Sequence, residues 1–256
     1  AGYGCRFDLL ANSNQDEKIM EVRLFKTANP VRFNTDKIKM RRTLRSGYLN
    51  EQLLKEDVAF LINDDSGFIH FIPNTSKEHS WLKEQTIEAN KLQANRDDAQ
   101  KELADWIRFS SKNAAEHADG LTTASMEIEG VAAWVLRNFY NKQDVMKQKF
   151  RQQSVSQVEK QVGHAPGWIL ITSPDSSTGT LIETGKRMQR LFLKVRDKNI
   201  AIHPMTQILE EPSIAGSLNS SMGINESVPF ILRTGYVKNY PGPVSLRRPI
   251  DKFVIT

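Results

Sequence analysis

The sequence predicts a fold that combines strands and helices, and the stretch Gly167–Gln207 gives the clearest evidence. The apolar run Trp168–Ile171 is long enough for one buried strand. Apolar residues then recur at helical spacing from Leu181 to Val195, with the basic residues off that stripe. A second apolar run, Ile200–Ile202, leads into a polar segment. On this pattern alone, the stretch either delivers groups to a ligand or only packs in the core.

The composition indicates one large globular domain or two small ones. The chain has 256 residues, of which 39% are hydrophobic and 25% charged. The net charge of +5 suits a phosphate-bearing ligand but does not establish a nucleic-acid binder. No apolar run approaches the ~20 residues that a membrane span needs. We therefore expect neither a nucleic-acid nor a membrane partner.

Cysteine and histidine usage limits the possible chemistry. The single Cys5 excludes a disulfide within the chain and a Cys-based zinc cluster, and it fits a reducing, cytoplasmic compartment. His70 has no second ligand at metal spacing and is interpreted as structural. Glu116, His117 and Asp119 are close in sequence but do not converge well on one ion, so no metal site is predicted.

The first thirty residues predict a pair of strands. The runs Cys5–Leu10 and Met20–Phe25 are strand-like, and the turn-rich Asn12–Asp16 separates them. Asn29-Pro30 closes this piece. Because the chain begins without Met and enters strand-like sequence at once, we expect that residues of the gene product precede it.

Two basic segments are candidates for binding an anion. In Asp36–Ser46, the side chains of Arg41, Thr43 and Arg45 share one face if the backbone is extended, which is a pattern suited to phosphate. The alternative is a solvated basic loop. The second segment is Ser245–Pro249, which contains Arg247 and Arg248.

The remaining elements follow from periodicity and turn signals. The motif Thr180–Glu183 has capping-box form and predicts a helix start there. Asp119-Gly120 predicts a turn. Strands are predicted at Phe68–Ile72 and Ser227–Val237. Further helices are predicted at Leu49–Ala59, Lys77–Ser110, Val131–Tyr140, Asp144–Lys160 and from Leu209 onward.

The chain resembles the FMN-dependent nitroreductase family, and most closely its Acg-type branch. Four segments carry the resemblance in the family's order. They are Arg41-Arg-Thr-Leu-Arg45; Glu102-Leu-Ala-Asp-Trp-Ile-Arg108 followed by Asp119-Gly120-Leu121; Gly185-Lys-Arg-Met-Gln-Arg-Leu-Phe-Leu193 followed by Ala201-Ile-His-Pro-Met-Thr-Gln207; and Leu232-Arg-Thr-Gly-Tyr236 followed by Arg247-Arg-Pro-Ile-Asp251. They cover the chain from about residue 20 to its end.

The resemblance implies an α+β fold, with a central, mostly antiparallel sheet between helices and FMN at a two-lobed interface. It assigns the phosphate grip to Arg41, Thr43 and Arg45, with Arg247 and Arg248 as late partners. It assigns the lining of the flavin ring to the segment His203–Gln207. The residues of that segment that we expect to bind the cofactor are His203, Met205, Thr206 and Gln207.

One family feature is missing from the sequence. Typical members carry a Ser/His-x-x-Gln-Pro-Trp-like segment that lines the flavin pocket, and Ala59–Pro73 has no such motif. In the Acg-type branch, one chain resembles two fused lobes, and that motif lies in the earlier lobe. We therefore interpret residues 1–30 as the end of an upstream lobe and residues 31–256 as a nitroreductase-like flavin-binding domain.

The function implied is that of an FMN-dependent oxidoreductase. Hydride would pass from NAD(P)H through FMN to a nitroaromatic, a quinone or a similar acceptor, with no catalytic side chain assigned. The alternative is a non-catalytic protein that stores FMN under a lid. The partners implied are a small-molecule electron acceptor and either a second copy of the chain, in a homodimer, or an intramolecular second lobe.

Overall fold

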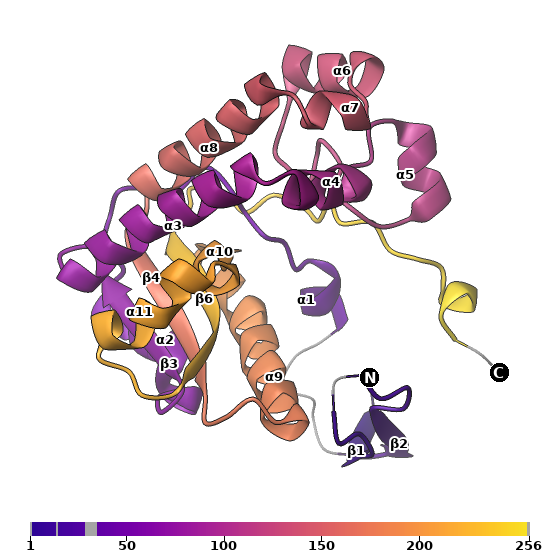
Figure 1. Ribbon diagram of the computed structural model, residues 1–256. Helices are drawn as coiled ribbons and strands as arrows, with labels where there is room; N and C mark the ends of the chain where they lie inside the picture. The colour runs from indigo at the N-terminus through magenta and orange to yellow at the C-terminus, as the bar shows by residue number, and fades with distance from the viewer. Residues whose placement is uncertain (1, 14, 29–34, 255–256) are drawn as a thin grey trace.

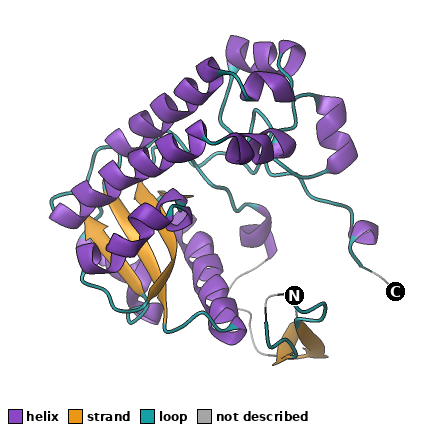
Figure 2. Ribbon diagram, in the orientation of Figure 1, coloured by secondary structure: helices purple, strands orange, loops and turns teal. Residues whose placement is uncertain are grey.

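The computed structural model describes residues 2–13, 15–28 and 35–254 and shows an α+β fold, as predicted (Figures 1 and 2). Its main sheet has four strands in the order β3-β4-β6-β5, and each neighbouring pair is antiparallel. The strands are β3 (Ile69–Pro73), β4 (Gly167–Ser173), β5 (Ile200–Pro204) and β6 (Ser227–Tyr236). All four lie where the apolar runs predicted them.

β4 is buried along its whole length because helices cover both faces of the sheet. Trp168 and Leu170 belong to the core on one face, whereas Ile169 and Ile171 belong to the core on the other. Successive side chains of a strand point to opposite faces, so a strand buried on both sides needs a continuous apolar run.

Each face of the sheet has its own set of helices (Figure 1). The Trp168 face packs against α3 (Lys77–Asn95), α8 (Gln148–Gly163), α10 (Gln207–Glu210) and α11 (Pro212–Met222). The Ile169 face packs against α2 (Lys55–Ile62) and α9 (Thr178–Lys194), after which α9 continues into the 3-10 helix η2 (Val195–Lys198). α3 and α8 lie side by side and form one layer.

Two helix starts differ from the sequence prediction. α9 begins at Thr178, with Ser177 as N-cap, so the capping box at Thr180 was a wrong prediction. The Thr180 hydroxyl instead donates to the Asp175 carboxylate at 2.6 Å. α2 begins at Lys55, not at Leu49, because the Leu49 N–H donates to the Tyr236 carbonyl at the end of β6.

The predicted single helix Lys77–Ser110 is also wrong, because the chain breaks at Arg96. That residue has φ −90° and ψ 130°, an extended conformation that separates α3 from α4 (Asp97–Trp106). A short helix, α5 (Ser111–His117), follows. The predicted helix Asp144–Lys160 is likewise divided, into α7 (Lys142–Val145) and α8.

A small second core lies beyond the break. Ala104, Ile107 and Val145 are buried there, and Leu121 and Phe150 pack against them. The helix α6 (Gly130–Phe139), predicted at Val131–Tyr140, follows the loop after Leu121. The structure thus carries a helical extension at one end of the α3–α8 layer (Figure 1).

The N-terminal strand pair is confirmed. β1 (Tyr3–Leu9) and β2 (Met20–Lys26) form an antiparallel hairpin apart from the main sheet. α1 (Thr35–Lys39), η1 (Asn63–Asp65) and η3 (Ile250–Lys252) complete the element list. The predicted closure at Asn29-Pro30 lies outside the described residues. Within the described ranges, no helix has the length and apolar character needed to cross a membrane.

Candidate functional site

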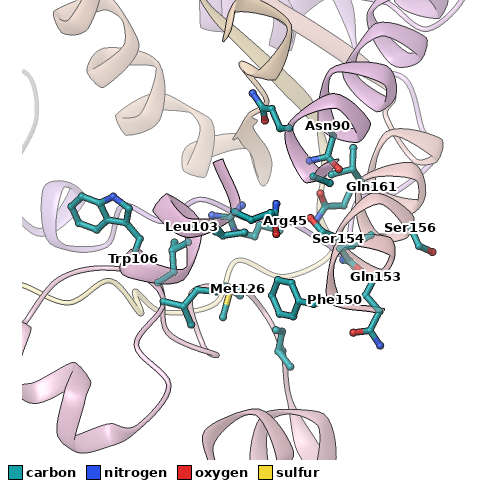
Figure 3. Close-up of a pocket in the computed structure, with 18 of the residues that line it drawn as sticks. Arg45, Asn90, Leu103, Trp106, Met126, Phe150, Gln153, Ser154, Ser156 and Gln161 are labelled. Atoms are coloured by element: carbon teal, nitrogen blue, oxygen red, sulfur yellow. The ribbon is translucent and has the colours of Figure 1, made fainter. Parts of the chain in front are cut away.

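Two adjoining hollows lie between the sheet and the helical extension. The larger has a volume of about 1430 Å³ and is bounded by α3, α4, α8, α6 and the loop Leu121–Glu129. The smaller has a volume of about 410 Å³ and lies beside the C-terminal segment. Arg45, Gly120 and Leu121 line both. Figure 3 shows side chains from α4, from α8 and from the loop that carries Met126 arranged around Arg45.

The larger hollow combines an apolar wall with many carboxamides. Leu103, Trp106, Met126 and Phe150 supply apolar surface (Figure 3). The lining carboxamides are Asn90, Gln93, Gln100, Gln153, Gln157, Gln161 and Gln207. Among the described residues, the buried side-chain oxygens of Asn90, Gln100 and Gln207 have no hydrogen-bond partner. Such groups cost free energy unless a ligand or water pairs with them.

Arg45 and His203 form the inner end of the larger hollow. The Arg45 Nη1 lies 2.9 Å from His203 Nε2, and its Nε donates to the Ser125 carbonyl at 3.1 Å. His203 is 97% buried, since its exposed fraction is 3%. Burial, with the charges of Arg45 and Arg233, holds the pKa of His203 well below its usual value. His203 is therefore a neutral imidazole at physiological pH.

A buried arginine, Arg233, contacts the backbone of Arg45. Arg233 on β6 donates through Nη2 to the Arg45 carbonyl at 2.6 Å and through Nη1 to the Gln161 carbonyl. Its guanidinium stacks on the Tyr48 ring, 4.0 Å from the centroid. Burial lowers the pKa of Arg233 from its ordinary value. These contacts fix the backbone of Arg45 to the sheet.

The smaller hollow brings the two basic segments together. Its lining includes Arg42, Thr43 and Arg45 from the early segment and Arg247 and Arg248 from the late one. The Arg42 Nε is buried and without a hydrogen-bond partner within the described structure. This concentration of guanidinium groups favours the binding of an anion.

One carboxylate shares the smaller hollow. Asp119 pairs with Arg108 at 2.6 Å and with Arg248. Hydrogen bonds from Arg108 and then Arg248 lower the pKa of Asp119. The Asp119 carboxylate therefore pairs with Arg248, and the Glu127 carboxylate lies 3.7 Å from the Arg42 guanidinium. Arg247, which has no carboxylate partner among the described residues, is the cation of this hollow best placed to receive an anion from outside.

Gly120 lets the chain pass close to α4 between the two hollows. It has φ +79°, and a Cβ there would lie 2.5 Å from the Trp106 carbonyl oxygen. The Leu121 N–H donates to that carbonyl at 2.8 Å, and the Arg108 N–H donates to the Leu121 carbonyl at 2.8 Å. A side chain at this position would push the two segments apart. The predicted turn at Asp119-Gly120 is present.

Three of the predicted site residues line neither hollow. Arg41 donates to the Gln189 side chain at 2.7 Å and stacks on Phe192, so it lies against α9. Met205 is 1% exposed and belongs to the core on the Trp168 face. Thr206 precedes α10 and lines neither hollow. Their assignment to cofactor binding stays a prediction.

The loop between Leu121 and Glu129 was not among the predicted site residues. No predicted element covers this stretch, yet it supplies Ser125 and Glu127 to the Arg45 segment. The hydroxyl residues Thr122 and Ser125, which close a local turn, were the one available signal. Among the described residues, no group of three or more His, Cys, Asp or Glu side chains is arranged to hold a metal ion.

Comparison with solved structures identifies the fold. No protein-family model and no curated protein matches the sequence. The FMN-dependent nitroreductase NfnB from Mycobacterium smegmatis, in complex with NADPH, matches with a TM-score of 0.51 and 14% identity, over 87% of this chain and 96% of that chain. The FMN- and NADPH-dependent nitroreductase NfnB from Sphigopyxis sp. strain HMH matches with a TM-score of 0.50 and 11% identity. That match covers 87% of this chain and 97% of that chain. The chain therefore shares the fold of FMN-dependent nitroreductases.

Proposed function

We propose that this chain binds FMN across the two adjoining hollows and acts as a nitroreductase-like flavin oxidoreductase. The observation that carries the proposal is Arg45, which lines both an apolar, carboxamide-rich hollow and an arginine-rich one. FMN has the matching parts, a planar ring with a polar edge and a phosphate. The shared fold of the nitroreductases supports the same choice.

The residues present fit FMN by their chemistry. The unpaired oxygens of Asn90, Gln100 and Gln207 offer acceptors to a ring that carries an N–H group, once those side chains rotate toward it. Trp106 and Phe150 offer apolar surface. Arg42 and Arg247 offer charge-assisted hydrogen bonds to a phosphate.

When bound, FMN would supply the redox chemistry, by taking a hydride from NAD(P)H and passing it to a nitroaromatic, a quinone or a similar acceptor. The contribution of the protein is to orient the ring, exclude water and hold the phosphate. His203 does not supply a proton readily as an imidazolium, because it is neutral. Its Nε2 accepts a hydrogen bond from Arg45, which can only donate.

The test is spectroscopic. Purified protein is incubated with FMN, freed of unbound flavin and scanned in the visible range. We expect flavin bands that bleach when NADH or NADPH is added without oxygen and return when an acceptor is added. Protein that retains no flavin, from the host or from added FMN, would refute the proposal.

A second candidate function is storage of FMN without turnover, and the position of α6 favours it. Ala132, Val135 and Leu136 line the larger hollow, whereas Val131 and Trp134 point away and are 78% and 53% exposed. α6 therefore forms part of the wall of the hollow, and storage would require it to restrict access there. Bound flavin that neither NADH nor NADPH bleaches would select storage over turnover.

We propose that a second lobe completes the flavin site, from a second copy or from the same polypeptide. All residues of Ala59–Pro73, the stretch without the Gln-Pro-Trp-like motif, are described, and none of them lines either hollow. Residues 31–256 are then the flavin-binding domain, and the β1–β2 hairpin belongs with the other lobe.

A further inference from the structure

The loop that follows Leu121 is closed on itself by hydrogen bonds. The Thr122 N–H donates to Ser125 Oγ at 2.8 Å, and the Ser125 N–H donates to Thr122 Oγ1 at 3.2 Å. The N–H groups of Met126 and Ile128 donate to the carbonyls of Thr122 and Thr123 at 2.9 Å each. This internal bonding makes the loop a stiff support and not a free connection.

Glu127 occupies an unusual place in this loop. Its φ is +58°, a left-handed conformation that is uncommon for a residue other than glycine. Its side chain is nevertheless only 9% exposed. Backbone strain combined with a buried carboxylate points to a positional requirement.

Within the described part of the chain, the Glu127 carboxylate makes its hydrogen bonds and its ion pair with the segment 42–46, which we call the basic arm. Oε1 accepts the Arg45 backbone N–H at 3.0 Å, and Oε2 accepts the Ser46 hydroxyl at 2.5 Å. The Arg42 guanidinium lies 3.7 Å from Oε1. One side chain thus pairs with three residues of the arm.

A neighbouring carbonyl of the same loop orients the Arg45 side chain. The Ser125 carbonyl accepts the Arg45 Nε–H at 3.1 Å, which turns Nη1 toward His203. The loop therefore fixes both the backbone and the guanidinium of Arg45. It also offsets the charge of Arg42 before any anion binds.

We infer that Glu127 is the positioning residue of the basic arm: it holds Arg42–Ser46 in place so that Arg42 and Arg45 line the smaller hollow. That the positioned arm binds a flavin phosphate rests on the proposed function. That Glu127 positions the arm does not, because it follows from the contacts of Glu127 alone.

Two substitutions at Glu127 distinguish its hydrogen bonds to the basic arm from its negative charge. Glu127→Gln removes the charge but keeps an oxygen for the Arg45 N–H and an amide for the Ser46 hydroxyl. Glu127→Ala removes both. Each variant retains a Cβ, so the backbone strain at φ +58° is the same in both. Glu116→Gln, an exposed carboxylate on α5, is the control for loss of one charge.

The first readout is cleavage by trypsin after Arg42 and Arg45 in the full chain, followed by mass spectrometry. We expect Glu127→Ala to be cut about tenfold faster than Glu127→Gln, the factor that corresponds to losing the two neutral hydrogen bonds that Gln retains with Arg45 and Ser46. Glu127→Gln and Glu116→Gln should remain close to the parent protein. Equal cleavage of the Ala and Gln variants would overturn the inference.

The second readout is the preference for FMN over riboflavin, which lacks the phosphate. Glu127→Ala and Glu127→Gln carry the same net charge, so a preference about tenfold lower in the Ala variant isolates the positioning role. Equal preferences would show that Glu127 is only structural and would overturn the inference. If no protein binds FMN, the proposed function fails, and the trypsin comparison alone decides whether Glu127 holds the arm.

Discussion

At the scale of single residues, the protonation of His203 follows from its neighbour. A guanidinium has only donors, so the His203 Nε2 that faces Arg45 must accept, and the proton of the neutral ring lies on Nδ1. That Nδ1 is buried and without a partner among the described residues. The resemblance predicted that His203 faces a flavin, but the sequence did not show that burial, together with the charges of Arg45 and Arg233, keeps the ring neutral.

The neutral state of His203 makes stability depend on pH. An unfolded histidine titrates near pH 6.5, whereas the folded pKa of His203 is well below that value. Below pH 6.5 the unfolded state therefore binds the additional proton, and the folded state loses stability as the pH falls. From pH 7.5 to 5.5 we expect a loss of about 1 kcal/mol from this group.

Urea unfolding at pH 7.5, 6.5 and 5.5 measures this dependence. His203→Gln keeps an acceptor for Arg45 and should flatten the profile by about that 1 kcal/mol. Some dependence should remain, because burial also lowers the pKa of His79. The exposed His117 on α5 supplies the matched control variant His117→Gln. An identical profile in His203→Gln would contradict the prediction.

Two arginines of the same sequence segment should differ in their effect on FMN binding. Arg45 lines both hollows, whereas Arg41 lies against Gln189 and Phe192 of α9. We expect Arg45→Ala to weaken FMN binding by roughly 1.5–3 kcal/mol, the cost of losing a charged hydrogen-bond partner, and Arg41→Ala to weaken it less. Fluorescence titration of both variants against FMN checks this, and equal losses would place Arg41 in the grip as well.

At the scale of elements, the sequence predicted the strands that are buried along most of their length. β4, β5 and β6 were found because short apolar runs of this length are typical of buried strands. The break between α3 and α4 was missed because Arg96 has good helix propensity. Its extended backbone is set by tertiary contacts, which no local pattern records.

Arg151 on α8 contacts both sides of this break, at Ala94 and at Asp97. It is 8% exposed, and it donates to the Ala94 carbonyl at 3.1 Å and the Met146 carbonyl at 3.0 Å. Its ion pair with Asp97 adds little, because the Asp97 side chain is 82% exposed. Arg151→Ala leaves buried carbonyls unpaired and should lower the free energy of unfolding by about 2–3 kcal/mol.

Urea unfolding of Arg151→Ala tests this contact, with the exposed Lys149→Ala on the same helix as control. Arg151→Lys should recover only part of the loss, since an ammonium cannot reach several separated carbonyls in the geometry of a guanidinium. Full recovery by lysine would indicate that charge, and not the pattern of hydrogen bonds, stabilises the break.

At the scale of the whole molecule, the site is assembled from segments far apart in the sequence. Arg45, Glu127, His203 and Arg247 come from four segments. The resemblance to a family predicted three of them as site residues, but the sequence gave no sign of Glu127. Glu127 acquires its role only through its contacts with the basic arm, which is distant in sequence. Its partner Ser46, for example, lies 81 residues away along the chain.

The β1–β2 hairpin is the part of the molecule least tied to this assembly. On one of its faces, Phe7, Val22 and Leu24 are 38%, 52% and 68% exposed. Its contacts with α9 include the stacking of Lys186 on Phe7, with the ammonium 4.6 Å from the ring centroid. An element that buries so little apolar surface on the rest of the chain contributes little to stability.

Removal of residues 1–30 should therefore leave the remaining domain folded. We expect residues 31–256 to unfold in urea with a free energy within about 1 kcal/mol of the full chain, the range of surface changes. The m-value should be nearly the same, because it scales with the surface exposed on unfolding and the hairpin is already exposed. Phe7→Ala in the full chain, which removes the ring beneath Lys186, is the matched control. A large loss in both proteins would place the hairpin within the main domain, because its packing on α9 would then be part of the core.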